Sequence, residues 1–222
     1  MGSDQLFHKR KARTSAVLKR KKAKRSSYDM VLIVCEGEKT EPNYFRALID
    51  DFQLNTANIV IADNSEGSSP INIVNSALEE YRKGKEYDRI YCVFDKDRHT
   101  TYNIALDKIR RAKLGKGHRI IATTSVPCFE FWLLLHFTYT TRQFDTHPGS
   151  ICANVISDIK TYLPDYEKGD VNIYKATKDS LETAITNCKR VDRHCETADT
   201  DMPSTKVHEL VEYLKNIKNY LL

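Results

Sequence analysis

The chain has 222 residues and a mass of 25.6 kDa, which suffices for one well-packed domain with an appendage but not for two ordinary catalytic domains. Hydrophobic residues make up 41% and charged residues 29%, a globular composition that excludes fibrous and disordered classes. The longest strongly apolar run, residues 131–137, is far shorter than the roughly 20 residues of a membrane helix. The N-terminus is polar and basic and lacks the apolar stretch of a secretory signal, so we expect a cytoplasmic protein without a membrane partner.

Positive charge is concentrated near the N-terminus. Residues 9–25 contain ten Lys and Arg and no acid, whereas residues 26–222 hold 25 bases and 29 acids. A segment of this kind attracts polyanions, so we expect residues 1–28 to form a flexible basic arm that binds DNA or RNA. Lys19, Arg20, Lys21 and Lys22 are its predicted contacts. A solvated tail without a dedicated partner is the alternative.

The first half of the ordered chain alternates β-branched runs with helical stretches. We expect strands at residues 30–35, 58–62, 89–94 and 118–123. Helices are expected at 40–52, from Pro70 to about Gly84, at 100–114 and at about 128–137. This alternation predicts an α/β domain over residues 29–138, with a mainly parallel four-stranded sheet flanked by helices.

The remainder, residues 139–222, is predicted to be a helical C-terminal extension packed on the α/β domain. Its helices are expected around 149–162, 176–190 and 204–220, with a polar loop at 192–203 and no further strand. The six cysteines contain no C-x-x-C pair, so a disulfide framework is not expected. A zinc site made of Cys188, His194, Cys195 and His208 would have a spacing that fits no standard ligand pattern.

Acidic residues follow two of the predicted strands. Glu36 comes directly after the first strand, and Asp95 and Asp97 come after the third. If the strand order is 2-1-3-4, all three carboxylates meet at the carboxyl edge of the sheet, where such folds bind ligands. Asp95 and Asp97 would point the same way, with Lys96 turned aside. Three clustered acids need a cation, most simply Mg²⁺ or Mn²⁺, and the alternative is a solvated loop edge.

Several stretches of the chain together form a family signature. They are VCEGEKTEPNYF at residues 34–45, VFDKDRH at 93–99 and PCFEFWLLLHF at 127–137, followed by Tyr174-Lys175 and by Pro203-Ser204-Thr205 before the last helix. In these stretches the chain resembles the RloB-like proteins, whose fold belongs to the TOPRIM superfamily. Val126 departs from the family pattern, in which we expect Asn, so a side-chain amide is not expected to serve the site.

The resemblance implies a TOPRIM-like fold and a function. According to this resemblance, the metal would be held by Glu36, Asp95 and Asp97. The same residues would catalyse phosphodiester hydrolysis, as in TOPRIM nucleases. RloB-like proteins are associated with bacterial antiviral defence by abortive infection, beside an ABC-type ATPase called RloA, so an RloA-like ATPase is the implied partner.

Other residues are candidates by position. Glu38, Glu41 and Glu130 lie at the same edge and could complete the metal shell, although Glu41 is equally well explained as an acid at a helix N-terminus. His99 could shuttle a proton or contact phosphate, and surface exposure without a role is the alternative. Lys39 and Lys175 could bind phosphate. His136 is expected to be a core histidine.

These observations predict a Mg²⁺- or Mn²⁺-dependent nuclease acting on DNA or RNA, tRNA included. Glu36 is also a candidate general acid or base. The alternative function is a non-catalytic TOPRIM module that binds nucleic acid or nucleotide and regulates a partner ATPase. The sequence does not predict the oligomeric state.

Overall fold

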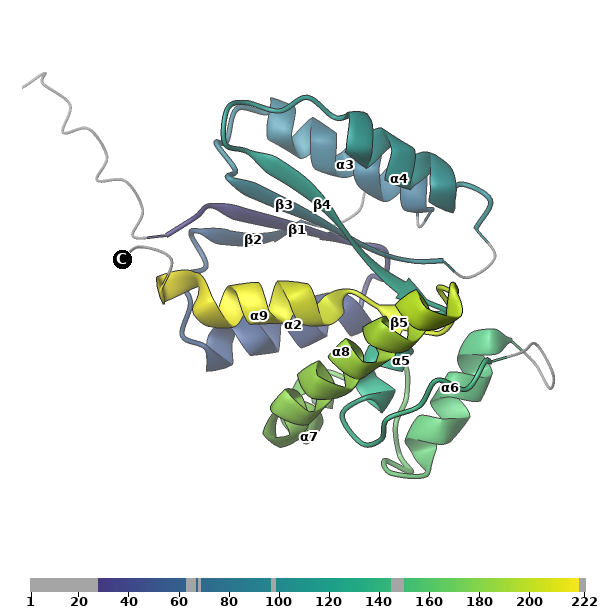
Figure 1. Cartoon of the computed structure of the whole chain (residues 1–222). Helices are drawn as coiled ribbons and strands as arrows, with labels where there is room; N and C mark the ends of the chain where they lie inside the picture. Colours follow the sequence, from purple (N-terminus) through teal and green to yellow (C-terminus); the bar gives the residue numbers. More distant parts are fainter. Residues whose placement is uncertain (1–27, 63–66, 68, 97–98, 145–149, 220–222) are drawn as a thin grey trace, which may run out of the picture.

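The computed structural model describes residues 28–62, 67, 69–96, 99–144 and 150–219, and these form a five-stranded sheet in the order β2-β1-β3-β4-β5 (Figure 1). The strands are β1 (Val31–Cys35), β2 (Ile59–Ala62), β3 (Arg89–Asp95), β4 (Arg119–Val126) and β5 (Ser204–Thr205). The first four run parallel, and β5 pairs antiparallel with the end of β4. The mainly parallel α/β class is thus confirmed, and β1 and β3 are neighbours as the 2-1-3-4 order requires.

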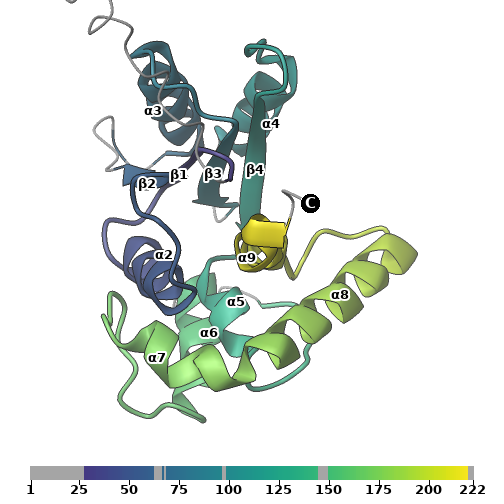
Figure 2. The same ribbon diagram turned by 90° about the vertical axis from the view of Figure 1, so that its left-hand side faces the viewer.

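Helices cover both faces of the sheet. They are α2 (Thr40–Asp51), α3 (Pro70–Arg82), α4 (Tyr102–Arg111), α5 (Glu130–Leu134), α6 (Ile151–Lys160), α7 (Ile173–Thr177), α8 (Leu181–Ala198) and α9 (Val207–Asn216). Short 3₁₀ turns follow α7 and α9. In Figure 1, α3 and α4 lie on one face, and α2 and α9 on the other. Figure 2 shows α7 and α8 beyond α2, away from α3 and α4.

Strand β1 is buried on both faces, which explains its uninterrupted apolar sequence. Val31, Ile33 and Cys35 belong to the core on the α2 and α9 side, and Leu32 and Val34 to the core beneath α3 and α4. Successive side chains of a strand point to opposite faces, so each helical layer receives alternate residues of the same strand. A central strand positioned in this way fixes where Glu36 leaves the sheet.

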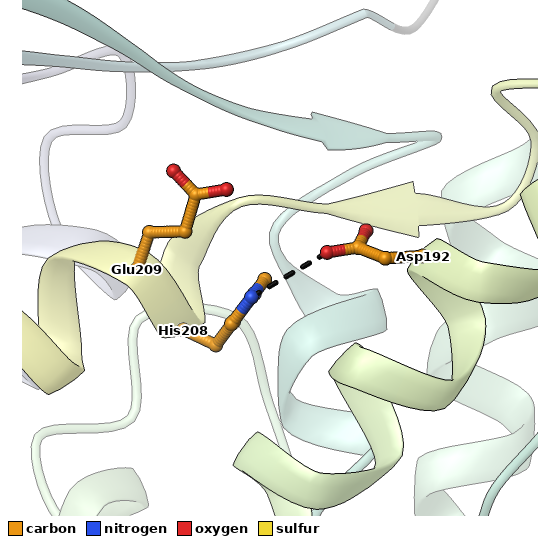
Figure 3. A group of neighbouring side chains, drawn as sticks. All are labelled: Asp192, His208 and Glu209. Atoms are coloured by element: carbon orange, nitrogen blue, oxygen red, sulfur yellow. Dashed lines mark ion pairs between the residues drawn. The ribbon is translucent and has the colours of Figure 1, made fainter. Parts of the chain in front are cut away.

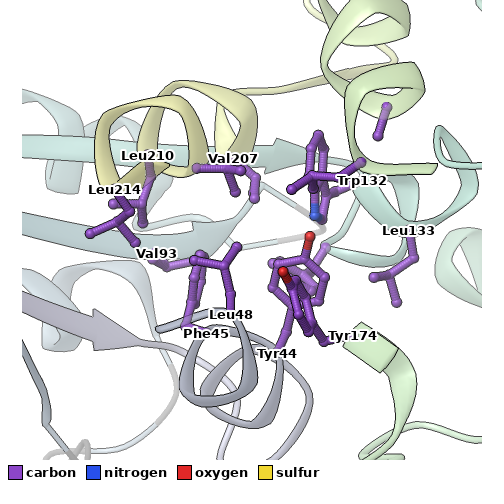
Figure 4. Packing of buried hydrophobic residues seen from close by; sticks show 14 of the residues in the cluster. Tyr44, Phe45, Leu48, Val93, Trp132, Leu133, Tyr174, Val207, Leu210 and Leu214 are labelled. Atoms are coloured by element: carbon purple, nitrogen blue, oxygen red, sulfur yellow. The ribbon is translucent and has the colours of Figure 1, made fainter. Parts of the chain in front are cut away.

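The C-terminal helices share a core with the α/β part. Figure 4 shows apolar side chains of α9, among them Leu210 and Leu214, beside Phe45 and Leu48 of α2. Trp132 of α5 and Tyr174 of α7 belong to the same buried cluster, and Trp132 is 0% exposed (Figure 4). His136 is also buried, and burial lowers its pKa to about 4, as expected for a core histidine.

The structure corrects three details of the predicted secondary structure. Residues 204–205 form β5 rather than the start of a helix, because Thr205 pairs with Ser125 of β4 through backbone and a 3.0 Å hydroxyl contact. Helix α8 continues through residues 192–198 of the segment expected to be a loop, because buried Val191 and partly buried Cys195 extend its apolar face. The apolar stretch 128–137 forms only the five-residue α5.

All six cysteines are free thiols, four of them buried. In the part of the chain that the structure describes, we find no helix with both the length and the apolar character needed to cross a membrane.

Candidate active site

Two of the predicted carboxylates meet where β1 and β3 end. The backbone N–H of Glu36 donates to Val93 O of β3 (2.9 Å). In return, Glu36 Oε2 accepts a hydrogen bond from the backbone N–H of Asp95 (2.8 Å), the last residue of β3. The parallel pairing of Cys35 with Val93 puts the two residues in register for this exchange. Asp97 lies outside the described residues, so its predicted role stays a prediction.

Around these two residues lies a pocket of about 430 Å³ that is rich in acids. Its lining comes from four separate parts of the chain: Glu36, Gly37, Glu38, Lys39, Thr40, Glu41, Asp95, Glu130, Lys168 and Gly169. Glu38 and Lys39 are exposed at the rim, whereas Glu41 and Glu130 are buried. Five acids and two lysines leave the lining with a nominal charge of −3 when all are ionised.

Glu41 reaches the pocket because residue 37 has no side chain. Glu41 stands in the first turn of α2 and is 6% exposed. A Cβ atom on Gly37 would lie 2.0 Å from Oε2 of Glu41, a distance that no side chain tolerates. Gly37 therefore packs its backbone against the Glu41 carboxylate. Glu41 is thus an acid at a helix N-terminus that also lines the pocket, and its place in a metal shell stays a prediction.

Glu130 is paired with a lysine from the C-terminal part of the chain. Its side chain is 2% exposed, and Lys168 Nζ lies 3.2 Å from Glu130 Oε1. The neighbouring Gly169 fixes this segment on α2: its N–H donates to Thr40 Oγ1 (2.9 Å), and its carbonyl accepts from Asn43 Nδ2 (3.1 Å). Burial tends to lower the pKa of Lys168, but the Glu130 carboxylate raises it above its usual value, so the lysine stays charged.

The pocket holds acids that resist ionisation. Burial, followed by the charges of Glu41, Glu130 and Glu36, raises the pKa of Asp95 well above its usual value, against a hydrogen bond from the Phe129 backbone. Burial and the charges of Glu130 and Glu36 raise the pKa of Glu41 from 4.5 to about 7, although its own backbone and Lys168 oppose this. Carboxylates placed this closely cannot all be charged unless a cation joins them.

The other predicted residues are placed as follows. His99 Nε2 lies 3.0 Å from Glu36 Oε1, so the histidine reaches the site. Lys96 points elsewhere, as expected, and pairs with Asp201. Lys175 is exposed on α7 and does not line the pocket. The arm residues Lys19, Arg20, Lys21 and Lys22 lie outside the described residues.

Sequence reasoning missed Lys168, Gly169 and Thr40, which complete one wall of the pocket. The signal available was weak: Gly169 has a φ of +84°, a conformation that favours glycine, but nothing local indicates that its loop docks on α2. Thr40 begins α2, and its hydroxyl accepts a hydrogen bond from the N–H of Gly169, more than 120 residues away.

Residues 31–214 match the model of one protein family, described as RloB-like protein. No curated protein matches the chain. No solved structure matches it either.

Proposed function

Because the chain belongs to the RloB-like protein family, we propose that it is a divalent-metal-dependent nuclease that hydrolyses phosphodiester bonds of DNA or RNA in antiviral defence. The observation that carries this proposal is the cluster of Glu36, Glu41, Asp95 and Glu130 around one pocket at the carboxyl edge of the sheet. Burying several carboxylates together lowers the stability of the fold. A bound cation would offset this loss and would act on a phosphate substrate.

The residues present suit Mg²⁺ or Mn²⁺. The donors are carboxylate oxygens, which these hard ions prefer, and the raised pKa values of Asp95 and Glu41 indicate a site short of positive charge. Glu36 and Asp95 would hold the ion, with Glu41, Glu130, the exposed Glu38 and, from the sequence, Asp97 as further ligands. When bound, a divalent ion lowers the pKa of water and stabilises the leaving oxygen of a phosphate ester.

The chain's own residues supply position and proton transfer. Glu36 is held by two contacts, one to the Asp95 N–H and one to His99, so its carboxylate has a fixed orientation for accepting or giving a proton. His99, beside Oε1, can pass that proton to solvent. Lys168, with a side chain 55% exposed, can contact a phosphate oxygen while keeping Glu130 neutralised. Lys39 at the rim and the basic arm would hold the polyanion.

The proposed partner is an RloA-like ABC-type ATPase, which rests on the resemblance alone. A defence nuclease must be restrained in an uninfected cell, so the isolated chain is expected to cleave weakly or not at all. The ATPase would then be the source of activation. Vigorous cleavage by the purified chain without a partner would contradict this restraint.

The test is a Mg²⁺ and Mn²⁺ titration of the purified protein with labelled plasmid, single-stranded DNA and total tRNA, with and without the ATPase. Asp95→Asn and Glu36→Gln keep the side-chain shapes and should abolish cleavage while nucleic-acid binding persists. Asp158→Asn is the matched control and should cleave normally, because Asp158 is a half-buried acid of α6 that is paired with Arg142 and does not line the pocket.

Two results would overturn the proposal. Cleavage that survives in both Asp95→Asn and Glu36→Gln would mean that the pocket is not the active site. Nucleic-acid binding without cleavage, in the presence of the ATPase and either metal, would instead support the non-catalytic module.

A further inference from the structure

A second group of metal-ligand side chains lies where α8 approaches the start of α9 (Figure 3). It consists of Asp192 of α8 with His208 and Glu209 of α9, whose ligand atoms all lie within 4.8 Å of one another. Among the described residues, no other group of three His, Cys, Asp or Glu meets this distance. His208 Nε2 lies 3.5 Å from Asp192 Oδ2. None of the three residues lines the pocket around Glu36.

His208 has unused capacity to bind. The residue is 4% exposed, and its Nδ1 is buried with no hydrogen-bond partner among the described residues. The other ring nitrogen, Nε2, faces Asp192 Oδ2 at 3.5 Å and is the atom that would bind an ion held there. Burial also lowers the pKa of His208, so the imidazole is neutral near pH 7 and offers a lone pair. Metal ligation by histidine requires this neutral form.

A cation already stands beside the two acids. Lys206 Nζ lies 3.0 Å from Asp192 Oδ2 and 3.5 Å from Glu209 Oε1. The lysine side chain is 41% exposed and that of Glu209 is 55% exposed, so both can move toward solvent, whereas Asp192 is 19% exposed. The arrangement therefore favours positive charge between Asp192 and Glu209. The Lys206 ammonium that lies there can exchange with another cation.

We propose that Asp192, His208 and Glu209 form a second metal site, for a borderline divalent transition ion of the Zn²⁺ class, which displaces the Lys206 ammonium. One imidazole and two carboxylates are a donor set for Zn²⁺, Mn²⁺, Fe²⁺ or Co²⁺, whereas Mg²⁺ prefers oxygen alone. Three protein ligands leave a position for water. The bound ion would link α8 to α9 directly after β5, and this site is independent of the proposed nuclease function.

The experiment measures Zn²⁺ binding to the full chain after removal of metals with a chelator. Competition with a chromophoric chelator gives the affinity, and elemental analysis gives the number of ions per chain. The wild type is expected to bind one equivalent more than His208→Gln and Asp192→Asn. His194→Gln is the matched control, because His194 is exposed on the same helix α8, and it should bind like the wild type.

Lys206→Met makes the proposal testable even if the His208 variant fails to fold. Removing the competing ammonium should tighten Zn²⁺ binding by roughly tenfold. This factor corresponds to the free energy of one exposed ion pair, or slightly more. Glu209→Gln, at an exposed position, should weaken it. Equal stoichiometry in the wild type, Asp192→Asn and His208→Gln would overturn the proposal, as would unchanged affinity in both Lys206→Met and Glu209→Gln.

Discussion

Glu41 should make the metal-free protein less stable as the pH rises, and Glu41→Gln should remove that loss. Burial first, and then the charges of Glu130 and Glu36, raise the pKa of Glu41 from 4.5 to about 7 in the folded chain. Between these pH values the folded state keeps a proton that the unfolded state has released, so stability falls with increasing pH. At roughly 1.4 kcal/mol per pH unit, the full loss is about 3 kcal/mol.

The assay is urea unfolding of wild type and Glu41→Gln at pH 5 and pH 8, in the presence of a chelator and followed by circular dichroism. Glutamine has the shape of the protonated acid and cannot ionise. We expect the variant to be more stable than the wild type by about 3 kcal/mol at pH 8 and by less than about 1 kcal/mol at pH 5.

Glu38→Gln is the control, because Glu38 is exposed on the loop before α2, and it should change the stability by less than about 0.5 kcal/mol. The reasoning fails if Glu41→Gln changes stability equally at the two pH values, or if it destabilises the protein at pH 8. Either result would mean that the cluster accommodates the Glu41 charge without a metal.

Three further predictions concern the pocket and the arm. Gly37→Ala should weaken Mn²⁺ binding at least about tenfold in calorimetry, because the new Cβ displaces the Glu41 carboxylate, and unchanged affinity would contradict this. Lys168→Met should cost about 1–2 kcal/mol in urea unfolding at pH 7, since it leaves buried Glu130 without its cation, while Lys39→Met at the rim should cost close to nothing. Deleting residues 1–27 should reduce the salt dependence of nucleic-acid binding, measured by fluorescence anisotropy, by several units in the slope of log K against log salt; an unchanged slope would exclude the arm as a contact.

The sheet could be predicted from the sequence because its inner strands are buried on both sides. Val31–Cys35 and the apolar part of Arg89–Asp95 form continuous apolar runs of strand length, and each ends at an acid. A parallel sheet places such ends at one edge, so Glu36 and Asp95 were predictable as neighbours without any knowledge of side-chain packing. The pairing of the Asp95 N–H with Glu36 follows from that register.

The elements that were not predicted depend on contacts between distant residues. Strand β5 has only two residues, too few for an alternating pattern, and exists because Thr205 meets Ser125 on β4. Lys168 belongs to a polar loop whose sequence is ordinary, and only the docking of Gly169 on Thr40 brings it to Glu130. The burial of Glu41 likewise depends on a glycine four residues earlier, which by itself is indistinguishable from a turn glycine.

The origin of Lys168 bears on what the helical part of the chain does. Glu36 and Asp95 stand on the sheet, but the lysine that neutralises Glu130 comes from residues after 138, the expected boundary of the α/β domain. The hydrogen bonds of Gly169 to Thr40 and Asn43 attach this segment to the same helix that carries Glu41. Removing the helical part would therefore take Lys168 away from Glu130 and would uncover the core that α5 shares with α7 and α9. The helical part thus forms a wall of the pocket rather than an appendage to it, and a truncated sheet domain would lack part of the candidate site.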